Sequence, residues 1–107
     1  MDGPSRYCMV LTTCPNEEEA RKIASLLIQE HLAACVQTTG ITSFYEWKGT
    51  VNTEGEQLLL IKARADRYGD IESFILKNHS YEVPEIVMIP IERGSATYLR
   101  WIDEVSR

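Results

Sequence analysis

The 107-residue sequence has no long apolar run, no phosphate-cradling glycine loop and no CxxC pair. Without an apolar stretch of about 18 residues, no transmembrane helix is predicted, and residues 1–6 lack the apolar core of a signal peptide. The three cysteines are an odd number, so a framework of disulfides is not expected. These absences predict a cytoplasmic protein with reduced thiols and no membrane partner.

Positive charge is also scarce. Eleven Lys and Arg residues against sixteen Asp and Glu residues give a formal net charge of -5. Nucleic-acid binders neutralise phosphates with clustered Lys and Arg, and no such cluster interleaved with aromatic residues occurs here, which excludes that class. No Ser-His-Asp set and no carboxylate pair in a defensible cleft is visible either, so we do not expect an enzyme.

The sequence does contain a long strand-like stretch, residues 33–64, with a turn signal at Lys48-Gly49 in its middle. A glycine suits the positive φ of a two-residue hairpin loop. The resulting arms are roughly twice the usual strand length of about 5–6 residues, so part of the ribbon should overhang the domain and pack its aromatic tip in an assembly. The predicted register pairs Trp47 with Thr50, Tyr45 with Asn52 and Val36 with Ile61.

The remaining patterns complete one domain. The order strand, helix, strand, strand, helix, strand, followed by an added helix, is the split βαβ, ferredoxin-like α+β pattern. Right-handed crossovers then predict an antiparallel sheet in the spatial order 4-1-3-2, with the first two helices on one face. We expect residues 7–107 to form this domain, with a long hairpin between the second and third strands and an extra C-terminal helix, and residues 1–6 to form a flexible leader.

The apolar strands do not suit a sheet that is covered on one face only. Such a sheet should alternate apolar and polar residues, yet residues 8–11, 58–61 and 86–89 are apolar without alternation. The second face must therefore meet either the third helix or another copy of the chain, since large exposed apolar patches are rare. A homo-oligomer with its sheet faces inward is the simpler prediction.

The predicted topology brings Cys14, His79 and Glu85 to the same end of the sheet. A thiolate, an imidazole and a carboxylate suit a borderline or soft divalent ion, and the helix N-terminus after Cys14 can stabilise a thiolate. Each residue also has an ordinary interpretation: His79 as a partner of the last helix carbonyls, Glu85 as a surface carboxylate and Cys14 as a loop residue. No HxxxH or CxxC spacing decides between them.

Tyr45, Trp47, Tyr81 and Lys62 are candidates for a small-molecule cleft between subunits. Lys62 follows an apolar run, where it would either neutralise an anionic ligand or pair with a carboxylate across an interface. The aromatic residues would either line the cleft or pack at that interface. Both alternatives stay open from the residues alone.

Several motifs, in this order, resemble the CutA family of divalent-cation-tolerance proteins, and the resemblance covers nearly everything after Arg6. The motifs are Pro15-Asn16-Glu17, Leu32-Ala33-Ala34-Cys35-Val36, Tyr45-Glu46-Trp47-Lys48-Gly49, Leu59-Leu60-Ile61-Lys62, the run from His79 to Ile86, and Tyr98-Leu99-Arg100-Trp101-Ile102.

The resemblance implies a cytoplasmic ferredoxin-like subunit in a tight homotrimer, linked to tolerance of copper and other divalent metals. Cu(II) or another divalent cation would be a bound ion rather than an obligatory cofactor. His79 and Glu85 fall where the family's proposed copper ligands lie. The family's bacterial cysteine falls at Thr12, two residues before Cys14, and its usual proline after the histidine is Ser80 here.

Two other functions remain as alternatives. One is a signalling trimer similar to the nitrogen-regulatory PII proteins, which would bind a small anionic ligand at subunit boundaries through Lys62, Tyr45 and Trp47. The other is a structural trimeric scaffold that anchors another protein.

Overall fold

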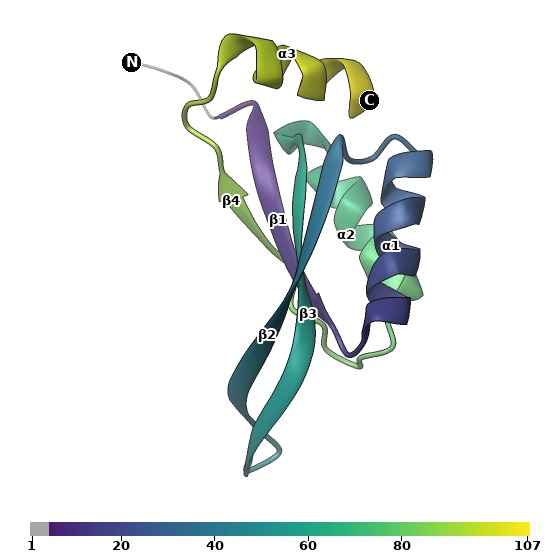
Figure 1. The fold of residues 1–107 in the computed structure, drawn as a ribbon, viewed down its shortest axis with the longest axis vertical. Coiled ribbons are helices and arrows are strands. Elements are labelled where there is room, and N and C mark those ends of the chain that lie inside the picture. Colours follow the sequence, from purple (N-terminus) through teal and green to yellow (C-terminus); the bar gives the residue numbers. More distant parts are fainter. Residues whose placement is uncertain (1–4) are drawn as a thin grey trace.

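The computed structural model describes residues 5–107, and in them the elements follow the predicted order (Figure 1). The α+β fold class, with a long hairpin and an added C-terminal helix, is confirmed. The elements are β1 (Tyr7–Cys14), α1 (Glu17–Gln29), β2 (Cys35–Trp47), β3 (Thr50–Arg64), a 3-10 turn η1 (Ala65–Arg67), α2 (Tyr68–Asn78), β4 (Val87–Pro90) and α3 (Ala96–Val105).

The predicted leader is only partly within the described residues, because residues 1–4 lie outside them. Ser5 and Arg6 are bound to the domain. The Ser5 hydroxyl contacts the carbonyl oxygens of Tyr7 at 2.9 Å and Ile91 at 2.5 Å, and the Arg6 carbonyl accepts from the Ala65 N–H at 2.8 Å. Both residues therefore contact the domain that follows them.

The four strands form one antiparallel sheet in the order β2-β3-β1-β4, which confirms the predicted order. The hairpin turns at Lys48 and Gly49, whose φ angles are 49° and 80°. Two positive φ values define the turn type that matches the twist of a two-residue hairpin. The pairs Trp47 with Thr50, Tyr45 with Asn52 and Val36 with Ile61 are all observed.

The hairpin extends beyond the rest of the sheet. β2 has 13 residues and β3 has 15, but β1 pairs with β3 only from Gln57 to Arg64. The outer parts of the two arms therefore pair only with each other, and Figure 1 shows them projecting past the helices. Near the tip, Phe44 is 74% exposed.

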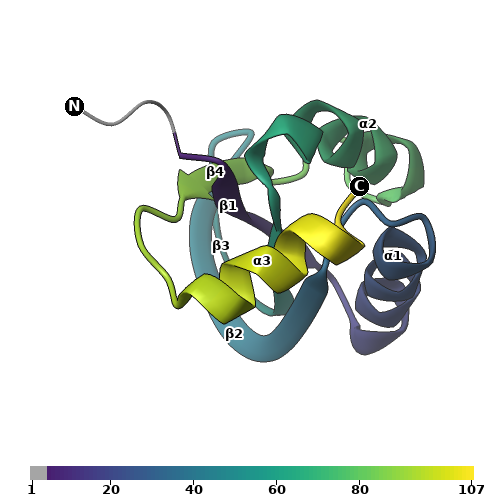
Figure 2. The same cartoon turned by 90° about the horizontal axis from the view of Figure 1, so that it is seen from above.

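The core lies between one face of the sheet and helices α1 and α2, which Figure 2 shows on the same side. Alternate residues of β1 and β3 point to these helices. α1 begins at Asn16, whose side-chain oxygen accepts from the Glu19 N–H at 2.8 Å, a standard cap for the exposed amides of a first turn. The largest fully buried apolar side chains of this core are Val10, Ile23, Leu27, Leu59, Ile61, Ile71 and Ile75.

The opposite side of the sheet, called the outer face below, is apolar but only partly covered. Of the two predicted covers, α3 does not lie over it. α3 crosses the end of the sheet (Figure 2), where Ile102 is fully buried and the Ser106 hydroxyl donates to the Leu32 carbonyl at 3.0 Å. By the strand register, the apolar residues of the outer face are Met9, Leu11, Leu58, Leu60, Val87 and Ile89, and the polar residues Thr13, Gln37, Thr39 and Lys62 lie on the same face.

Thr12 is an exception among the buried residues on the helix side of β1. Its hydroxyl is buried with no hydrogen-bond partner among the described residues. Because an unpaired buried hydroxyl opposes folding, Thr12→Val should raise the free energy of unfolding by about 1 kcal/mol. Urea denaturation measures this change. Thr39→Val, at an exposed position of β2, is the control, and a lower stability of Thr12→Val would show that the hydroxyl is paired.

Candidate functional site

Three potential metal ligands meet where β1 ends, α1 begins and α2 ends. One ligand atom each from Cys14, Glu19 and His79 lies within 4.8 Å of the other two. Cys14 is the last residue of β1, and Glu19 lies in the first turn of α1. His79 follows α2 directly. Because Pro15 and the capping Asn16 turn the chain from strand into helix within two residues, Glu19 returns close to Cys14.

The His79 ring is fully buried and oriented by the backbone. Nε2 lies 2.6 Å from the Thr13 carbonyl oxygen, which can only accept, so Nε2 carries the proton. Nδ1 accepts from the Tyr81 N–H at 3.0 Å and lies 3.4 Å from Glu19 Oε2. The Nδ1 lone pair therefore lies on the same side of the ring as Glu19.

Cys14 differs from its prediction. Burial raises the pKa of its thiol to about 12, and the carboxylates of Glu19 and Glu56 add to this rise. The predicted thiolate is therefore wrong for the protein without a bound cation, because desolvation and two negative charges outweigh the dipole of α1. A metal ion at this position would have to displace the thiol proton.

The three side chains nevertheless fit a divalent ion. Sulfur, imidazole nitrogen and carboxylate oxygen are the ligands that zinc and copper take in proteins. A ligating histidine commonly donates its other N–H to a backbone carbonyl, which is what Nε2 of His79 does with Thr13. At Nδ1 the ion would replace the Tyr81 N–H.

The structure therefore brings together Cys14 and His79, but their third neighbour is Glu19. Glu85 does not belong to this group, and it lines an adjacent cleft instead. Glu19 was not among the residues predicted for this site. The signal was available, because the Asn16 cap places Glu19 in the position from which a side chain reaches back over the helix start.

The adjacent cleft lies between the hairpin and the loop after α2, and it has a volume of about 570 Å³. Tyr45, Trp47 and Tyr81 line it together, and the Tyr81 hydroxyl donates to Glu56 Oε2 at 2.7 Å. Lys62 is far from them in the ribbon. It pairs with Cys35 of β2 and its ammonium group contacts the Gln37 side chain, so one chain does not combine Lys62 with the aromatic residues.

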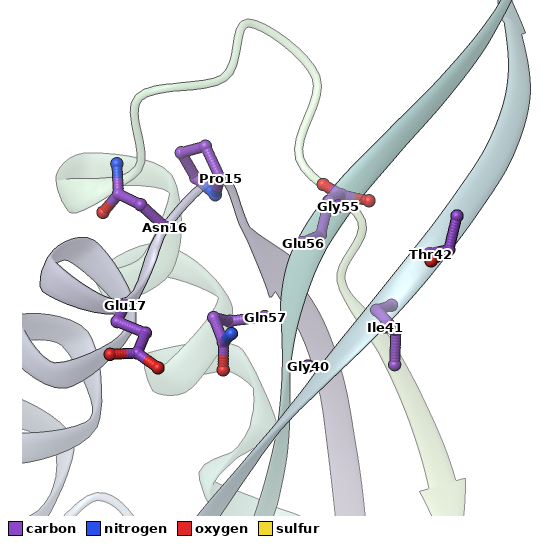
Figure 3. Close-up of a pocket in the computed structure, with 9 residues that line it drawn as sticks. All are labelled: Pro15, Asn16, Glu17, Gly40, Ile41, Thr42, Gly55, Glu56 and Gln57. Carbon is purple, nitrogen blue, oxygen red and sulfur yellow. The ribbon is translucent and has the colours of Figure 1, made fainter.

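A second hollow of about 540 Å³ lies between the start of α1 and the two hairpin strands (Figure 3). Its walls include Asn16, Glu17 and Gln57, while Glu56 is shared with the cleft. Asn16 is already used as the helix cap. This hollow therefore adds only one carboxylate, that of Glu17, to the groups described above.

The match to known proteins covers nearly the whole chain. The family model described as CutA1 divalent ion tolerance protein matches residues 8–105. This chain belongs to the CutA1 family. It is 44% identical over 97 residues to the divalent-cation tolerance protein CutA of Thermus thermophilus, with 90% of this chain and 94% of that protein covered. It is 42% identical to the chloroplastic protein CutA of Arabidopsis thaliana.

Solved CutA structures have the same fold. The periplasmic divalent cation tolerance protein CutA from Archaeoglobus fulgidus superimposes with a TM-score of 0.93 at 37% identity, covering 94% of this chain and 99% of that chain. CutA1 from Oryza sativa also gives 0.93, at 38% identity, with 97% and 96% covered.

Several of the curated relatives are longer than the region that this chain matches. The matched region is 55%, 59% and 58% of the Arabidopsis, mouse and human CutA proteins. One relative, from Arabidopsis thaliana, is named as chloroplastic, and another, from Archaeoglobus fulgidus, is named as periplasmic. Among residues 5–107 of this chain, no helix is long and apolar enough to cross a membrane.

Proposed function

We propose that this chain is a non-catalytic, cytoplasmic divalent-cation-tolerance protein that binds copper or another divalent ion through Cys14, Glu19 and His79. The observation that carries the proposal is the approach of three chemically different ligand atoms to within 4.8 Å of one another. The divalent-cation-tolerance names of its relatives support it. The bound ion would be the species to which the protein responds.

We also propose that the working unit is a homotrimer assembled through the outer face. Val87 and Ile89 on this face are 46% and 43% exposed in the single chain, beside the half-buried Met9, Leu11 and Leu60. A contiguous apolar surface of this kind marks an interaction site. The projecting hairpin, with its exposed aromatic tip, supports the same assembly.

The test is a calorimetric titration of Cu(II) and Zn(II) into metal-free protein. The native chain should bind about one ion per subunit and release a proton, because Cys14 must lose its thiol hydrogen. His79→Ala, Cys14→Ser and Glu19→Gln should each weaken binding by at least about 10-fold to 100-fold, and sedimentation should show an unchanged oligomer.

Glu85→Gln is the matched control, because it removes the same charge as Glu19→Gln from outside the cluster. Unchanged affinity in His79→Ala would remove the imidazole from the site and contradict the proposal. Weak binding in Glu85→Gln together with normal binding in Glu19→Gln would instead identify Glu85 as the third ligand.

The two alternatives have less support from this chain. A signalling trimer that binds an anion needs a basic group at the cleft, and no Lys, Arg or His lines the cleft among the described residues. A scaffold that anchors another protein would use the same exposed hairpin as the trimer. We therefore retain the cation-binding protein as the proposed function.

A further inference from the structure

The backbone of the segment after α2 lies against the proposed metal ligands. Ser80 and Tyr81, called the strap below, follow His79 directly, and each donates its N–H to a ligand side chain. The Ser80 N–H lies 3.2 Å from Glu19 Oε2, and the Tyr81 N–H lies 3.0 Å from His79 Nδ1. Two of the three ligand side chains are therefore hydrogen-bonded to the strap in this structure.

Both ring nitrogens of His79 are already used. The ring is fully buried, and Nε2 is bonded to the Thr13 carbonyl oxygen. Nδ1, the nitrogen close to Glu19, accepts from the Tyr81 N–H. Because Nδ1 has only one lone pair, it cannot accept this hydrogen bond and bind a metal ion at the same time. An ion can therefore reach Nδ1 only after the Tyr81 N–H has moved away.

The Tyr81 side chain attaches the strap to the sheet. Its ring packs against the His79 ring, with 4.8 Å between the two centroids and 45° between the planes. Its hydroxyl donates to Glu56 Oε2 at 2.7 Å, and Glu56 of β3 is only 8% exposed. Hydrogen bonds to an ionised carboxylate are stronger than those between neutral groups. The strap is thus bonded to α1, to His79 and to β3.

We propose that the strap closes the metal site and that ion binding opens it. The inference rests on the proposed function, because it concerns the regulation of the same cluster of Cys14, Glu19 and His79. The free energy of opening the strap is subtracted from the free energy of ion binding, as for any site whose competent state is only partly populated. A weaker strap should therefore bind the ion more tightly, whereas the loss of a ligand weakens binding. Occupancy of the site is thereby coupled to the conformation of the segment between α2 and β4.

Hydrogen exchange of single amides, measured by NMR with Zn(II) as the probe, tests the opening. In metal-free protein the amide protons of Ser80 and Tyr81 should be protected. Saturating Zn(II) should make both exchange at least about 10-fold faster, because a broken hydrogen bond exposes its donor to water. The Glu19 N–H is the internal control. It lies in the same cluster but donates to Asn16, so its exchange should change little.

Ser80→Pro tests the energy of the strap by calorimetry with Zn(II). Proline removes the Ser80 N–H, and the His79 backbone, with a φ of -91° and a ψ of 143°, already has the extended conformation that a following proline favours. Loss of the bond to Glu19 should make Zn(II) binding about 5-fold to 10-fold tighter. Ser80→Ala is the matched control, because it keeps the N–H and should bind Zn(II) as the native chain does.

Tyr81→Phe provides a second measurement in case Ser80→Pro disturbs the segment. It keeps the N–H and the ring but loses the bond to Glu56, so Zn(II) binding should become about 3-fold to 10-fold tighter. Tyr68→Phe is its control. It removes an equivalent hydroxyl bond, to Glu72 Oε2 at 2.7 Å, from the opposite end of α2, and the affinity should not change.

Two results would overturn the strap and leave the metal site intact. One is Zn(II) binding that requires His79 but does not speed the exchange of the Ser80 and Tyr81 amides. The other is an affinity in Ser80→Pro and Tyr81→Phe that is no higher than in their controls. The absence of saturable Zn(II) binding to the native chain would contradict the proposed function, and the strap with it, so the calorimetric titration distinguishes the two failures.

Discussion

Leu60→Glu is expected to dissociate the proposed trimer into monomers at micromolar concentration. Leu60 lies at the centre of the outer face, with Leu11 opposite it on β1. A carboxylate at this position would lose its hydration in every subunit on assembly, which costs several kcal/mol per copy, and each loss of about 1.4 kcal/mol weakens association tenfold. Sedimentation velocity over a concentration series measures the change.

Ser25→Glu is the matched control for this substitution. It adds the same charge at an exposed position of α1, so it should leave the oligomer unchanged. Leu60→Ala is a milder companion, and its melting temperature should depend more strongly on protein concentration than that of the native chain. An intact trimer in Leu60→Glu would show that the outer face is not the contact surface.

Leu59→Ala should lower the free energy of unfolding by about 2–5 kcal/mol. Its side chain is fully buried against the helices, next to Val10 and Ile61. Truncation removes apolar contacts and leaves a cavity that a close-packed core fills only in part. Guanidinium denaturation followed by far-UV circular dichroism gives the value.

The comparison between Leu59→Ala and Leu60→Ala separates the two faces of β3. The loss of stability in Leu59→Ala should be the same at every protein concentration, since Leu59 packs within its own subunit. The loss of stability in Leu60→Ala should grow as the protein is diluted. Equal, concentration-independent losses in both variants would contradict the assignment of Leu60 to a surface between subunits.

Local patterns in the sequence were sufficient for the fold. The Lys48-Gly49 turn determines the hairpin register, because a two-residue loop leaves only one alignment of the two arms. That register correctly placed Val36 opposite Ile61, near the end of the two arms that lies farthest from the turn. The apolar runs also predicted correctly that both faces of the sheet carry apolar residues. Only the structure showed that α3 lies across the end of the sheet and not over its second face.

The candidate site was predictable only in outline. Topology placed Cys14 and His79 at one end of the sheet, since strand direction determines where each strand ends. Sequence spacing could not select Glu19 over Glu85, because the choice depends on how closely the start of α1 approaches the end of α2. The hydrogen bond from His79 to the Thr13 carbonyl joins residues 66 positions apart, and no local pattern encodes such a contact.

The sequence by itself determined the strands, the helices, the hairpin and the family, because these depend on periodicity, turn chemistry and ordered motifs. Tertiary structure alone decided the protonation of Cys14 and the separation of Lys62 from the aromatic cleft. It also decided the position of Glu56, a carboxylate buried beside Tyr81. These properties depend on burial and on distances between side chains, which arise only when distant segments pack together.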